Sequence, residues 1–371
     1  MKKVCHLTSV HPPFDIRIFH KECKTLCQAG YQVVLIAPHD QDEEVDGVRI
    51  RALRKAKSRF KRMTQTVWGA YKESINQEAD TFHFHDIELL PVGLLLKLRG
   101  KRVIYDVHED YSQALLSREW IPSWLRHMVS RMVVCGEWLG AKYFDGVVVA
   151  TPHIARRFPT MKTVTVQNFP FLNQSIRNPI IPYQQREKIV AYVGVVSALR
   201  GAKEMVKAMA LLPDRLDVRL KIAGIFSPGG LEGEVKNLPG GDWVDFLGWQ
   251  RHKETMAMLG EARIGLVVFR PVPNHTEAQP NKLFEYMSAG IPVIASDFLL
   301  WRRIVGETQC GLLVDPLNPK AIAEAIQWLL EHPAEAEVMG KRGQKAIREH
   351  YNWDVEAQKL LTLYERILGQ R

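Results

Sequence analysis

The stretch NHTEAQPNKLFEYMSAGIPVIASD, residues 274–297, decides the fold of the second half of the chain. Pro280 suits the first turn of a helix, where its missing N–H would have no intrahelical partner in any case. Gly290 is a common helix stop, and the apolar run after it is typical of a buried strand. The stretch therefore predicts a loop that carries Glu277, a short helix from about Pro280 to Ala289, and then a strand.

The same stretch holds residues suited to binding a phosphorylated sugar. A helix N-terminus with a lysine in its first turn is a good phosphate site, and Lys282 has that position, next to Pro280 and Asn281. Glu285 lies three residues further on, so it shares a helical face with Lys282. Two carboxylates, Glu277 and Glu285, flank this helix start, where they could hold sugar hydroxyls.

Composition indicates an ordinary globular protein. The chain has 371 residues, enough for two domains, with 46% hydrophobic and 25% charged residues. Its five cysteines are scattered and match no metal-site spacing, which favours a reducing compartment. The start has too short an apolar segment for a signal peptide, and no uncharged run is long enough to span a membrane. We therefore expect a cytoplasmic protein.

The net charge of +9 predicts an acidic partner. The excess of positive charge is concentrated in one stretch of the chain. Residues 49–62, RIRALRKAKSRFKR, contain eight Lys/Arg and no Asp/Glu. A solvated helix face and a surface for anionic lipid headgroups both explain this stretch. Nucleic acid is a third explanation, but no nucleic-acid-binding motif accompanies the charges, so no nucleic-acid partner is expected.

Residues 119–144, EWIPSWLRHMVSRMVVCGEWLGAKYF, interleave tryptophan and arginine in a helical pattern. Such residues suit a membrane interface, and core packing explains many of them equally well. The first interpretation predicts a peripheral protein on the inner face of the cell membrane.

The chain begins with the alternation of a doubly wound α/β domain. Strand-like runs at residues 3–9 and 31–37 enclose a helical segment at residues 16–30. The loop after the first strand contains Asp15 and Arg17, and open α/β sheets bind ligands at that end of a strand. The loop lacks a G-x-G-x-x-G fingerprint, which counts against a dinucleotide oxidoreductase.

A later buried strand, residues 102–107, ends at His108, Glu109 and Asp110. Histidines and carboxylates at strand ends could ligate a metal, but their spacing here matches no standard site. Hydrogen-bonding groups that line a cleft are favoured instead. His108 follows the strand directly and is the strongest candidate; the alternative is a capping histidine. Together with Asp15 and Arg17, Glu109 and Asp110 are candidates for the acceptor side of a site.

The α/β pattern restarts after a proline-rich segment. The predicted organisation is a first domain at 1–170, a linker at 171–187, a second domain at 188–350 and a final helix at 351–371. In the second domain, Gly194 to Gly201 (GVVSALRG) joins a strand to a helix. Its small residues let a ligand approach, and Arg200 offers a forked phosphate donor. With the Glu277–Glu285 stretch it forms a two-sided phosphate clamp.

These residues resemble glycosyltransferase family 4. Glu277 and Glu285 match its E-x7-E pair, and AGIPVIASD matches the usual continuation. Gly194 to Gly201 is similar to the family's phosphate loop, G-R-L-x-x-x-K-G. His108 resembles its N-domain histidine, and the tail YNWDVEAQKLLTLYERIL resembles its terminal segment.

The resemblance implies a GT-B fold, in which two Rossmann-like doubly wound domains face each other across a cleft and the last helix crosses back to the first domain. It implies that Glu277 holds the transferred sugar and Glu285 the ribose, while Arg200 and Lys282 neutralise the diphosphate. It also implies a retaining, front-face mechanism that uses a nucleotide-sugar as co-substrate. No metal or other cofactor is expected, because the two cations can do the neutralising.

The chain departs from the family pattern at two positions. Val195 stands where the family often has arginine, and Arg200 stands where it often has lysine. We hypothesise that Lys282 supplies the lost charge from the opposite side.

HPPFDIRIFHKE and YDVHEDY are similar to family members that build bacterial surface polysaccharides such as exopolysaccharide, capsule or O-antigen. The expected acceptor is a lipid-linked saccharide or growing polysaccharide. Two alternatives remain: a nucleotide-sugar epimerase of the same fold, and a non-catalytic nucleotide-binding protein at the membrane surface.

Overall fold

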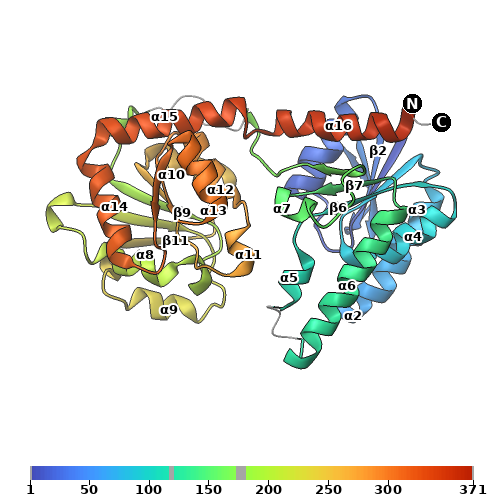
Figure 1. Cartoon of the computed structure of the whole chain (residues 1–371), viewed down its shortest axis with the longest axis horizontal. Helices are drawn as coiled ribbons and strands as arrows, with labels where there is room; N and C mark the ends of the chain where they lie inside the picture. The colour runs from blue at the N-terminus through green and yellow to red at the C-terminus, as the bar shows by residue number, and fades with distance from the viewer. Residues whose placement is uncertain (1, 117–120, 173–180, 370–371) are drawn as a thin grey trace. The chain divides into compact units, whose positions relative to one another are not determined.

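The structure, a computed structural model, describes residues 2–116, 121–172 and 181–369 (Figure 1). It divides into two compact units. Unit 1 comprises Met1–Asn168 and Trp353–Arg371, and unit 2 comprises Phe169–Asn352. Of the predicted linker, residues 173–180 lie outside the described residues, and so do residues 119 and 120 of the predicted tryptophan-rich segment.

Unit 1 contains one sheet, whose strands are β1 (Lys3–Leu7), β2 (Gln32–Pro38), β3 (Glu43–Val45), β4 (Val48–Leu53), β5 (Thr81–Phe84), β6 (Arg102–Val107), β7 (Gly146–Val149) and β8 (Thr163–Thr165). Their order is β3-β4-β2-β1-β5-β6-β7-β8, parallel throughout except for the β3–β4 pair. The helical segments around it are η1 (Ile16–Cys23), α1 (Lys24–Gln28), α2 (Arg59–Lys61), η2 (Arg62–Thr66), α3 (Val67–Asn76), η3 (Ile87–Leu89), α4 (Leu90–Leu98), α5 (Tyr111–Leu116), α6 (Ser123–Tyr143), α7 (Pro152–Ala155) and α16 (Trp353–Gly369).

Unit 2 contains a wholly parallel sheet in the order β11-β10-β9-β12-β13-β14. Its strands are β9 (Ile189–Val193), β10 (Arg219–Ala223), β11 (Val244–Gly248), β12 (Ile264–Val267), β13 (Val293–Ser296) and β14 (Gly311–Val314). Its helical segments are η5 (Tyr183–Gln185), η6 (Ala198–Arg200), α8 (Ala202–Met209), η7 (Asp214–Leu216), α9 (Leu231–Lys236), η8 (Gly241–Trp243), α10 (His252–Glu261), α11 (Pro273–Thr276), α12 (Asn281–Ala289), α13 (Leu299–Trp301), η9 (Arg302–Gly306), α14 (Pro319–Glu331) and α15 (Pro333–Glu349).

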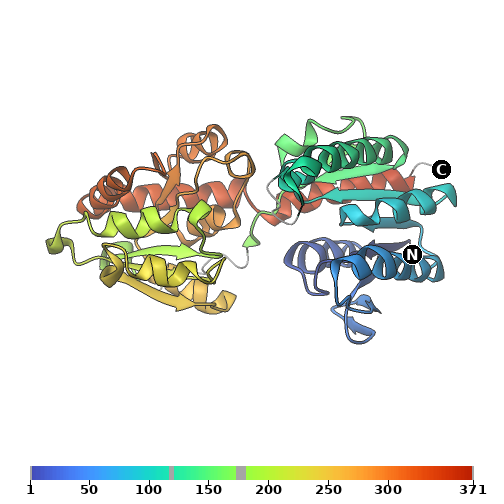
Figure 2. The same cartoon turned by 90° about the horizontal axis from the view of Figure 1, so that it is seen from below.

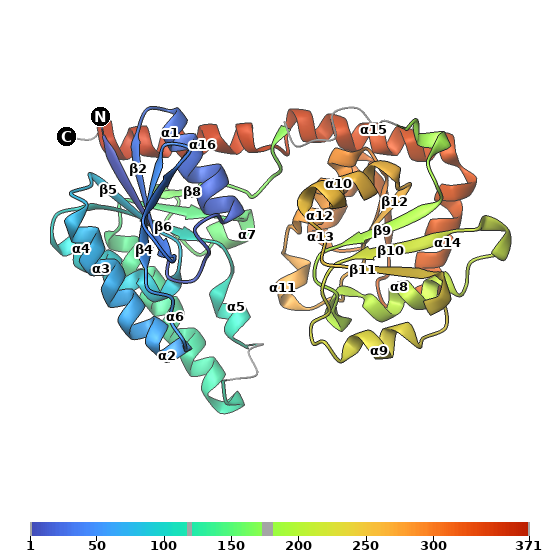
Figure 3. The same cartoon turned by 180° about the vertical axis from the view of Figure 1, so that it is seen from behind.

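Each unit is a doubly wound α/β fold, as the sequence predicts. Helices cover both faces of each sheet (Figures 1 and 2), and in unit 2 α8 lies on the opposite face from α10 and α12 (Figure 3). The strand order reverses between β1 and β5 in unit 1 and between β9 and β12 in unit 2. Ligands of open α/β sheets bind at the carboxyl ends of the strands beside such a switch point.

The last helix, α16, belongs to unit 1 although unit 2 precedes it in the chain. Trp353 Nε1 donates a hydrogen bond to Thr25 Oγ1 (2.9 Å), and Glu356 Oε2 accepts one from the backbone N–H of Gln167 (2.9 Å). Both contacts stay within unit 1. The predicted crossing of the last helix back to the first domain is therefore confirmed.

Two local predictions need correction, and one gains detail. The segment at residues 16–30 is helical as predicted and opens with π-type turns in η1, and Asp15 caps it by accepting hydrogen bonds from the backbone N–H groups of residues 17 and 18. The basic stretch is not one helix face, since Arg49 and Arg51 lie in strand β4. A one-turn helix, α11, precedes Glu277 where a loop was predicted. Among the helices that the structure describes, none is both long and apolar enough to cross a membrane.

Gly201 provides a test of the packing in unit 2. Its φ is +74°, and a Cβ there would lie 2.0 Å from the backbone oxygen of Val268. Gly248 has a similar φ of +66° but open space around it. We expect Gly248→Ala to lower the free energy of unfolding by about 1–2 kcal/mol for the left-handed backbone. Gly201→Ala should lower it by about 1–3 kcal/mol more, because backbone must also shift. Denaturant unfolding of both variants measures this, and equal losses would contradict the close approach.

Candidate active site

Helix α12 is fixed against the switch point of unit 2 by Tyr286. The Tyr286 ring rests on Gly265 of β12, where a Cβ would lie only 2.3 Å from a ring carbon. Its hydroxyl oxygen accepts a hydrogen bond from the backbone N–H of Val193, at the end of β9 (2.9 Å). Gly290 ends the helix in the left-handed conformation (φ +69°), as the sequence predicts. The helix face that Tyr286 defines therefore points to the carboxyl end of β9.

Lys282 lies one turn before Tyr286 and shares its helix face. The side chain is buried, and its ammonium Nζ is 3.6 Å from the ring centroid of Tyr192 and 5.2 Å from that of Phe269. A Cβ placed on Gly194 would lie 3.6 Å from the same nitrogen. Among the described residues, Lys282 Nζ has no hydrogen-bond partner. Burial, and secondly the charge of Arg200, hold the pKa of Lys282 well below its ordinary value.

Arg200 approaches Lys282 from the other segment, as the predicted clamp requires. It ends the short η6 turn just before Gly201, and its guanidinium carbon lies 5.6 Å from the ring centroid of Phe269. Its Nη1 donates to the carbonyl of Val195 at 3.4 Å. Two cations thus lie near one aromatic ring, and the charge of Glu285 offsets the effect of Arg200 on the pKa of Lys282 only in part. An anion is the group that would relieve this repulsion.

The remaining predicted residues of unit 2 surround these two cations in the chain. Glu277 directly follows α11 and is partly buried, and Glu285 is partly buried on α12. Pro280 is the residue before α12, and Asn281 is its exposed first residue. Gly194, with φ +100°, is exposed where β9 ends. The structure brings Lys282, Arg200 and Gly194 together.

Aromatic residues that sequence reasoning missed complete this site. The rings of Tyr192 and Phe269 make cation–π contacts with the Lys282 ammonium. Tyr192 Oη donates a hydrogen bond to the Val195 carbonyl (2.7 Å). The ring of His275 lies 4.8 Å from that of Phe269, and burial, with the charges of Arg200 and Lys282, lowers the pKa of His275. An imidazole close to both cations was visible in the sequence only as a residue two positions before Glu277.

In unit 1, polar residues gather where β1 and β5 end. Asp86 accepts hydrogen bonds at Oδ2 from Thr8 Oγ1 (2.8 Å) and from the backbone N–H of Ser9 (2.6 Å). His11 Nε2 lies 3.5 Å from Asp86 Oδ1, and His11 Nδ1 lies 3.5 Å from Asp15 Oδ2. Asp86 therefore organises the switch-point loop of this unit, a role the sequence did not reveal.

His108 is held by a buried carboxylate. Its Nε2 is 3.0 Å from Asp106 Oδ2 and 3.2 Å from His85 Nδ1, and its side chain is 12% exposed. Asp106 also accepts two hydrogen bonds from Arg17, at 3.0 Å each. Burial alone would raise the pKa of Asp106, but the charges of Arg17 and His108 hold it well below its usual value. The His108 side chain is therefore held in one orientation, and it is not an exposed capping residue.

The candidate acceptor-side residues occupy different environments. Arg17 is buried, and its Nη1 donates to the carbonyl of Val166 (2.8 Å), so it positions Asp106 in the interior. Asp110 accepts from Arg157 Nη1 (2.6 Å) and Ser112 Oγ (2.5 Å). Asp15 precedes η1, where burial would raise its pKa, but the hydrogen bonds from His11 and the backbone N–H of Ile18, with the charges of His11 and His108, together lower it. Glu109 is exposed.

Among the residues that the structure describes, two groups in unit 1 have the donor set for a metal ion. One is His85, Asp106 and His108; the other is His6, Glu22, His83 and His85, all buried. In each group one ligand atom per residue lies within 4.8 Å of the others.

Comparison with known proteins places the chain in a class. A family model described as "Glycosyltransferase Family 4" matches residues 17–165, and one described as "Glycosyl transferases group 1" matches residues 176–346. A sucrose-phosphate synthase from Thermosynechococcus elongatus superposes with a TM-score of 0.80 over 100% of both chains, at 22% identity. Anabaena HepE, in complex with UDP and glucose, gives 0.73 over 99% of this chain and 100% of that one, at 14% identity. The fold is that of the GT-B glycosyltransferases.

A curated relative, MMP alpha-(1->4)-mannosyltransferase from Mycolicibacterium hassiacum, is 23% identical over 312 residues, which cover 77% of this chain and 71% of that protein. Of several other curated relatives the chain covers about half or less. The two family models together span most of the chain, in the order of its two units. The chain belongs to glycosyltransferase family 4 and is a nucleotide-sugar-dependent glycosyltransferase.

The lowered pKa of Lys282 predicts a proton linkage. A bound diphosphate would raise this pKa, because it stabilises the ammonium. Between the lowered value and the ordinary value of 10.5, binding should therefore take up a proton, and affinity should fall as pH rises. Calorimetry in two buffers of different ionisation enthalpy measures the uptake, with whichever of UDP, GDP and ADP stabilises the protein against heat. Lys282→Met should abolish the proton uptake. An unchanged uptake in this variant would show that the diphosphate does not bind at Lys282.

Proposed function

We propose that this chain is a retaining glycosyltransferase whose unit 2 holds the diphosphate of a nucleotide-sugar on Lys282 and Arg200. The observation that carries the proposal is the buried ammonium of Lys282, which has no hydrogen-bond partner among the described residues and faces Gly194. Leaving such a charge without a partner is costly unless a ligand supplies one. The end of β9 at the switch point is the expected place for that ligand.

The proposed chemistry follows from where charge develops. Breaking the sugar–phosphate bond leaves positive charge on the sugar ring and negative charge on the departing diphosphate. Fixed cations that stabilise the departing charge are commonly the largest catalytic contribution. Lys282 and Arg200 have this role in the proposal, Glu277 holds the transferred sugar, and Glu285 holds the ribose. The departing phosphate oxygen accepts the proton of the acceptor hydroxyl, which attacks from the same face.

His108 supplies a positioning group in unit 1. Its Nε2 is fixed by Asp106, which Arg17 in turn holds by two hydrogen bonds. An imidazole oriented in this way presents its other nitrogen in one direction. We assign it to a hydroxyl of the transferred sugar.

The proposal needs no metal at the diphosphate, because two cations already converge there. Turnover should not change when Mg²⁺ or Mn²⁺ is added to metal-stripped assay buffer. A loss of activity in the stripped buffer that Mg²⁺ or Mn²⁺ restores, and Zn²⁺ does not, would contradict this part of the proposal.

The proposed acceptor is a lipid-linked saccharide or growing surface polysaccharide, used at an anionic membrane. The support is an exposed apolar stripe on α6, at helical spacing, formed by Trp124, Met128, Met132, Cys135 and Leu139. Arg131 and Lys142 on the same helix are basic, and Lys142 Nζ lies 5.8 Å from the ring centroid of exposed Trp138. Aromatic, apolar and basic side chains on one exposed helix suit a membrane interface.

The basic stretch contributes less than its composition suggests. Lys55 pairs with Asp40 (2.8 Å), Arg62 pairs with Glu88 (2.7 Å), and Arg51 pairs with Asp42 (2.5 Å). Phe60 between them is 77% exposed. Part of the positive charge is therefore already compensated within unit 1.

Removing the Lys282 ammonium tests the site. We expect Lys282→Ala to lower kcat/KM about a hundredfold or more, the scale for losing one preorganised donor. Lys320→Ala, on the exposed start of α14, is the matched control and should leave turnover unchanged. Donor consumption is assayed with and without a lipid-linked acceptor, since an epimerase would convert the donor alone. Equal kcat/KM in Lys282→Ala and wild type would refute the diphosphate assignment.

Neutral changes on the α6 stripe test the membrane contact. We expect Trp124→Ser with Met128→Gln to reduce co-sedimentation with vesicles that contain anionic lipid at least severalfold, because the apolar contact is lost. Trp249→Ser, an equally exposed tryptophan in unit 2 (67%, against 77% for Trp124), is the control. Binding that persists in the α6 variant would exclude this surface.

A further inference from the structure

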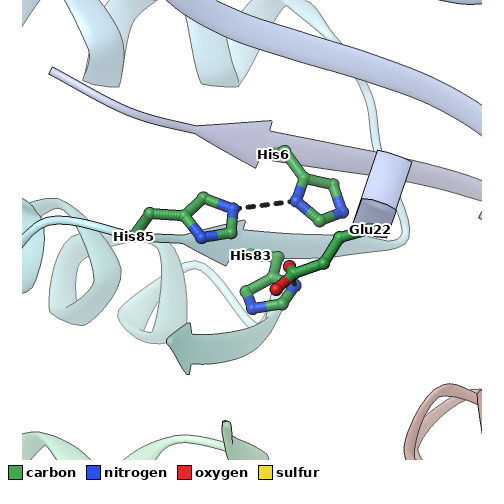
Figure 4. A group of neighbouring side chains, drawn as sticks. All are labelled: His6, Glu22, His83 and His85. Carbon is green, nitrogen blue, oxygen red and sulfur yellow. Dashed lines mark hydrogen bonds and ion pairs between the residues drawn. The ribbon is translucent and has the colours of Figure 1, made fainter. Parts of the chain in front are cut away.

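Strand pairing creates a histidine cluster that sequence spacing does not show. In the parallel register of β1 and β5, His6 is paired with His83. His85 lies two residues beyond His83, so both side chains leave the strand on one face of the sheet. Segment η1 covers this face and contributes Glu22 (Figure 4). Three imidazoles and one carboxylate from three segments therefore meet inside unit 1.

The geometry of the cluster suits a single small cation. One ligand atom from each of the four residues lies within 4.8 Å of the other three. His6 Nδ1 is 2.9 Å from His85 Nε2, and Glu22 Oε2 is 3.9 Å from Nδ1 of the His83 ring, whose other nitrogen, Nε2, has no hydrogen-bond partner among the described residues. All four side chains are fully buried. Bonds of ~2.0–2.2 Å to a central ion, as zinc makes to histidine and carboxylate, require small rearrangements of these side chains.

Several polar atoms of the cluster lack a partner. Among the described residues, His83 Nε2 and both carboxylate oxygens of Glu22 make no hydrogen bond. Glu22 Oε1 lies 3.1 Å from Arg17 Nε, which compensates charge on that side only. Buried polar atoms are almost always satisfied, so a group of unsatisfied ones indicates a bound species.

The surroundings resemble the outer shell of a metal site. A ligating histidine usually donates its other N–H to a carboxylate or another polar group, which fixes its tautomer. His85 Nδ1 is 3.2 Å from Asp106 Oδ2. Tyr364 Oη, from α16, is 2.8 Å from His83 Nδ1 and 3.3 Å from His6 Nε2.

A hydrogen-bond network alone is the competing explanation. The short contact between His6 and His85 requires a hydrogen between the two nitrogens when no cation is bound. Such a network accounts for the His6–His85 and Tyr364 contacts. It leaves Glu22 Oε2 and His83 Nε2 without a hydrogen bond among the described residues, whereas a cation satisfies both together.

We propose that His6, Glu22, His83 and His85 form a structural binding site for one divalent transition-metal ion of the zinc class. Three imidazole nitrogens and one carboxylate oxygen complete a four-coordinate shell, with no position left for water, as structural zinc sites require. Magnesium and calcium are disfavoured, because they prefer oxygen ligands. The site is separate from the two cations of unit 2 and would hold η1 to the sheet of unit 1.

Metal content of the full chain tests the proposal. The purified protein is stripped with a chelator, incubated with a slight excess of Zn²⁺, passed over a desalting column and analysed by atomic emission. We expect one zinc per chain in the wild type and a higher melting temperature with zinc, because binding stabilises the folded state. Glu22→Gln and His83→Gln should retain less than a fifth of that zinc.

His20→Gln is the matched control, since His20 lies exposed on the same η1 segment as Glu22. It should retain zinc as the wild type does. If the cluster variants do not fold, Co²⁺ loaded into the wild type decides the question, because tetrahedral Co²⁺ absorbs visible light far more strongly than octahedral Co²⁺. Wild-type protein that retains no zinc, zinc retained equally by both cluster variants, or a weak octahedral Co²⁺ spectrum would each overturn the proposal.

Discussion

The buried ammonium of Lys282 is the feature on which the proposed donor site depends. A lysine that is buried without a hydrogen-bonding partner is tolerated only where something else stabilises its charge. Here two aromatic faces, Tyr192 and Phe269, do so in part. The arrangement leaves the ammonium close to Gly194, with Arg200 adding a second positive charge. The fold thus concentrates positive charge at this point, and a bound diphosphate is suited to neutralise it.

Unit 1 differs, because its interior holds buried carboxylates and histidines. These groups need hydrogen-bond or charge partners inside the unit. Arg17 lies between Asp106 and Glu22, and Asp106 orients His85 and His108. This interior connects the largely buried His108 with the C-terminal helix through side chains alone. The same doubly wound topology therefore places two cations at the switch point of unit 2 and a polar interior in unit 1.

The fold was largely predictable from the sequence, and so was the approach of Lys282 to Arg200 in unit 2. Helix stops such as Gly290, continuous apolar strands and the E-x7-E spacing are local signals, and the structure places Lys282 and Arg200 together as expected. Local sequence signals do not show which residues of neighbouring strands come together in the folded sheet. From the sequence, Tyr192 and Phe269 are indistinguishable from core residues. Only the folded arrangement of β9 and β12 brings their rings close to the Lys282 ammonium.

Arg17 shows the same limit in unit 1. It follows a ligand-binding loop in sequence, yet the η1 turns direct its guanidinium inward to Asp106. The available signal was Asp106 itself, a carboxylate inside an apolar strand that needs a buried cation. The cluster of His6, Glu22, His83 and His85 was equally hidden, since its members come from three segments that pair only in the folded chain.

Hydrogen exchange measured by mass spectrometry, with and without the nucleotide-sugar that most raises the melting temperature, tests the central claim most directly. The account predicts that donor binding slows exchange in residues 193–201 and 277–286 of unit 2, since these carry both cations and both carboxylates. It predicts no such slowing at these segments in Lys282→Ala at the same donor concentration. Donor binding that protects other parts of unit 2 and leaves both segments unchanged would contradict the assignment of Lys282 and Arg200 to the diphosphate.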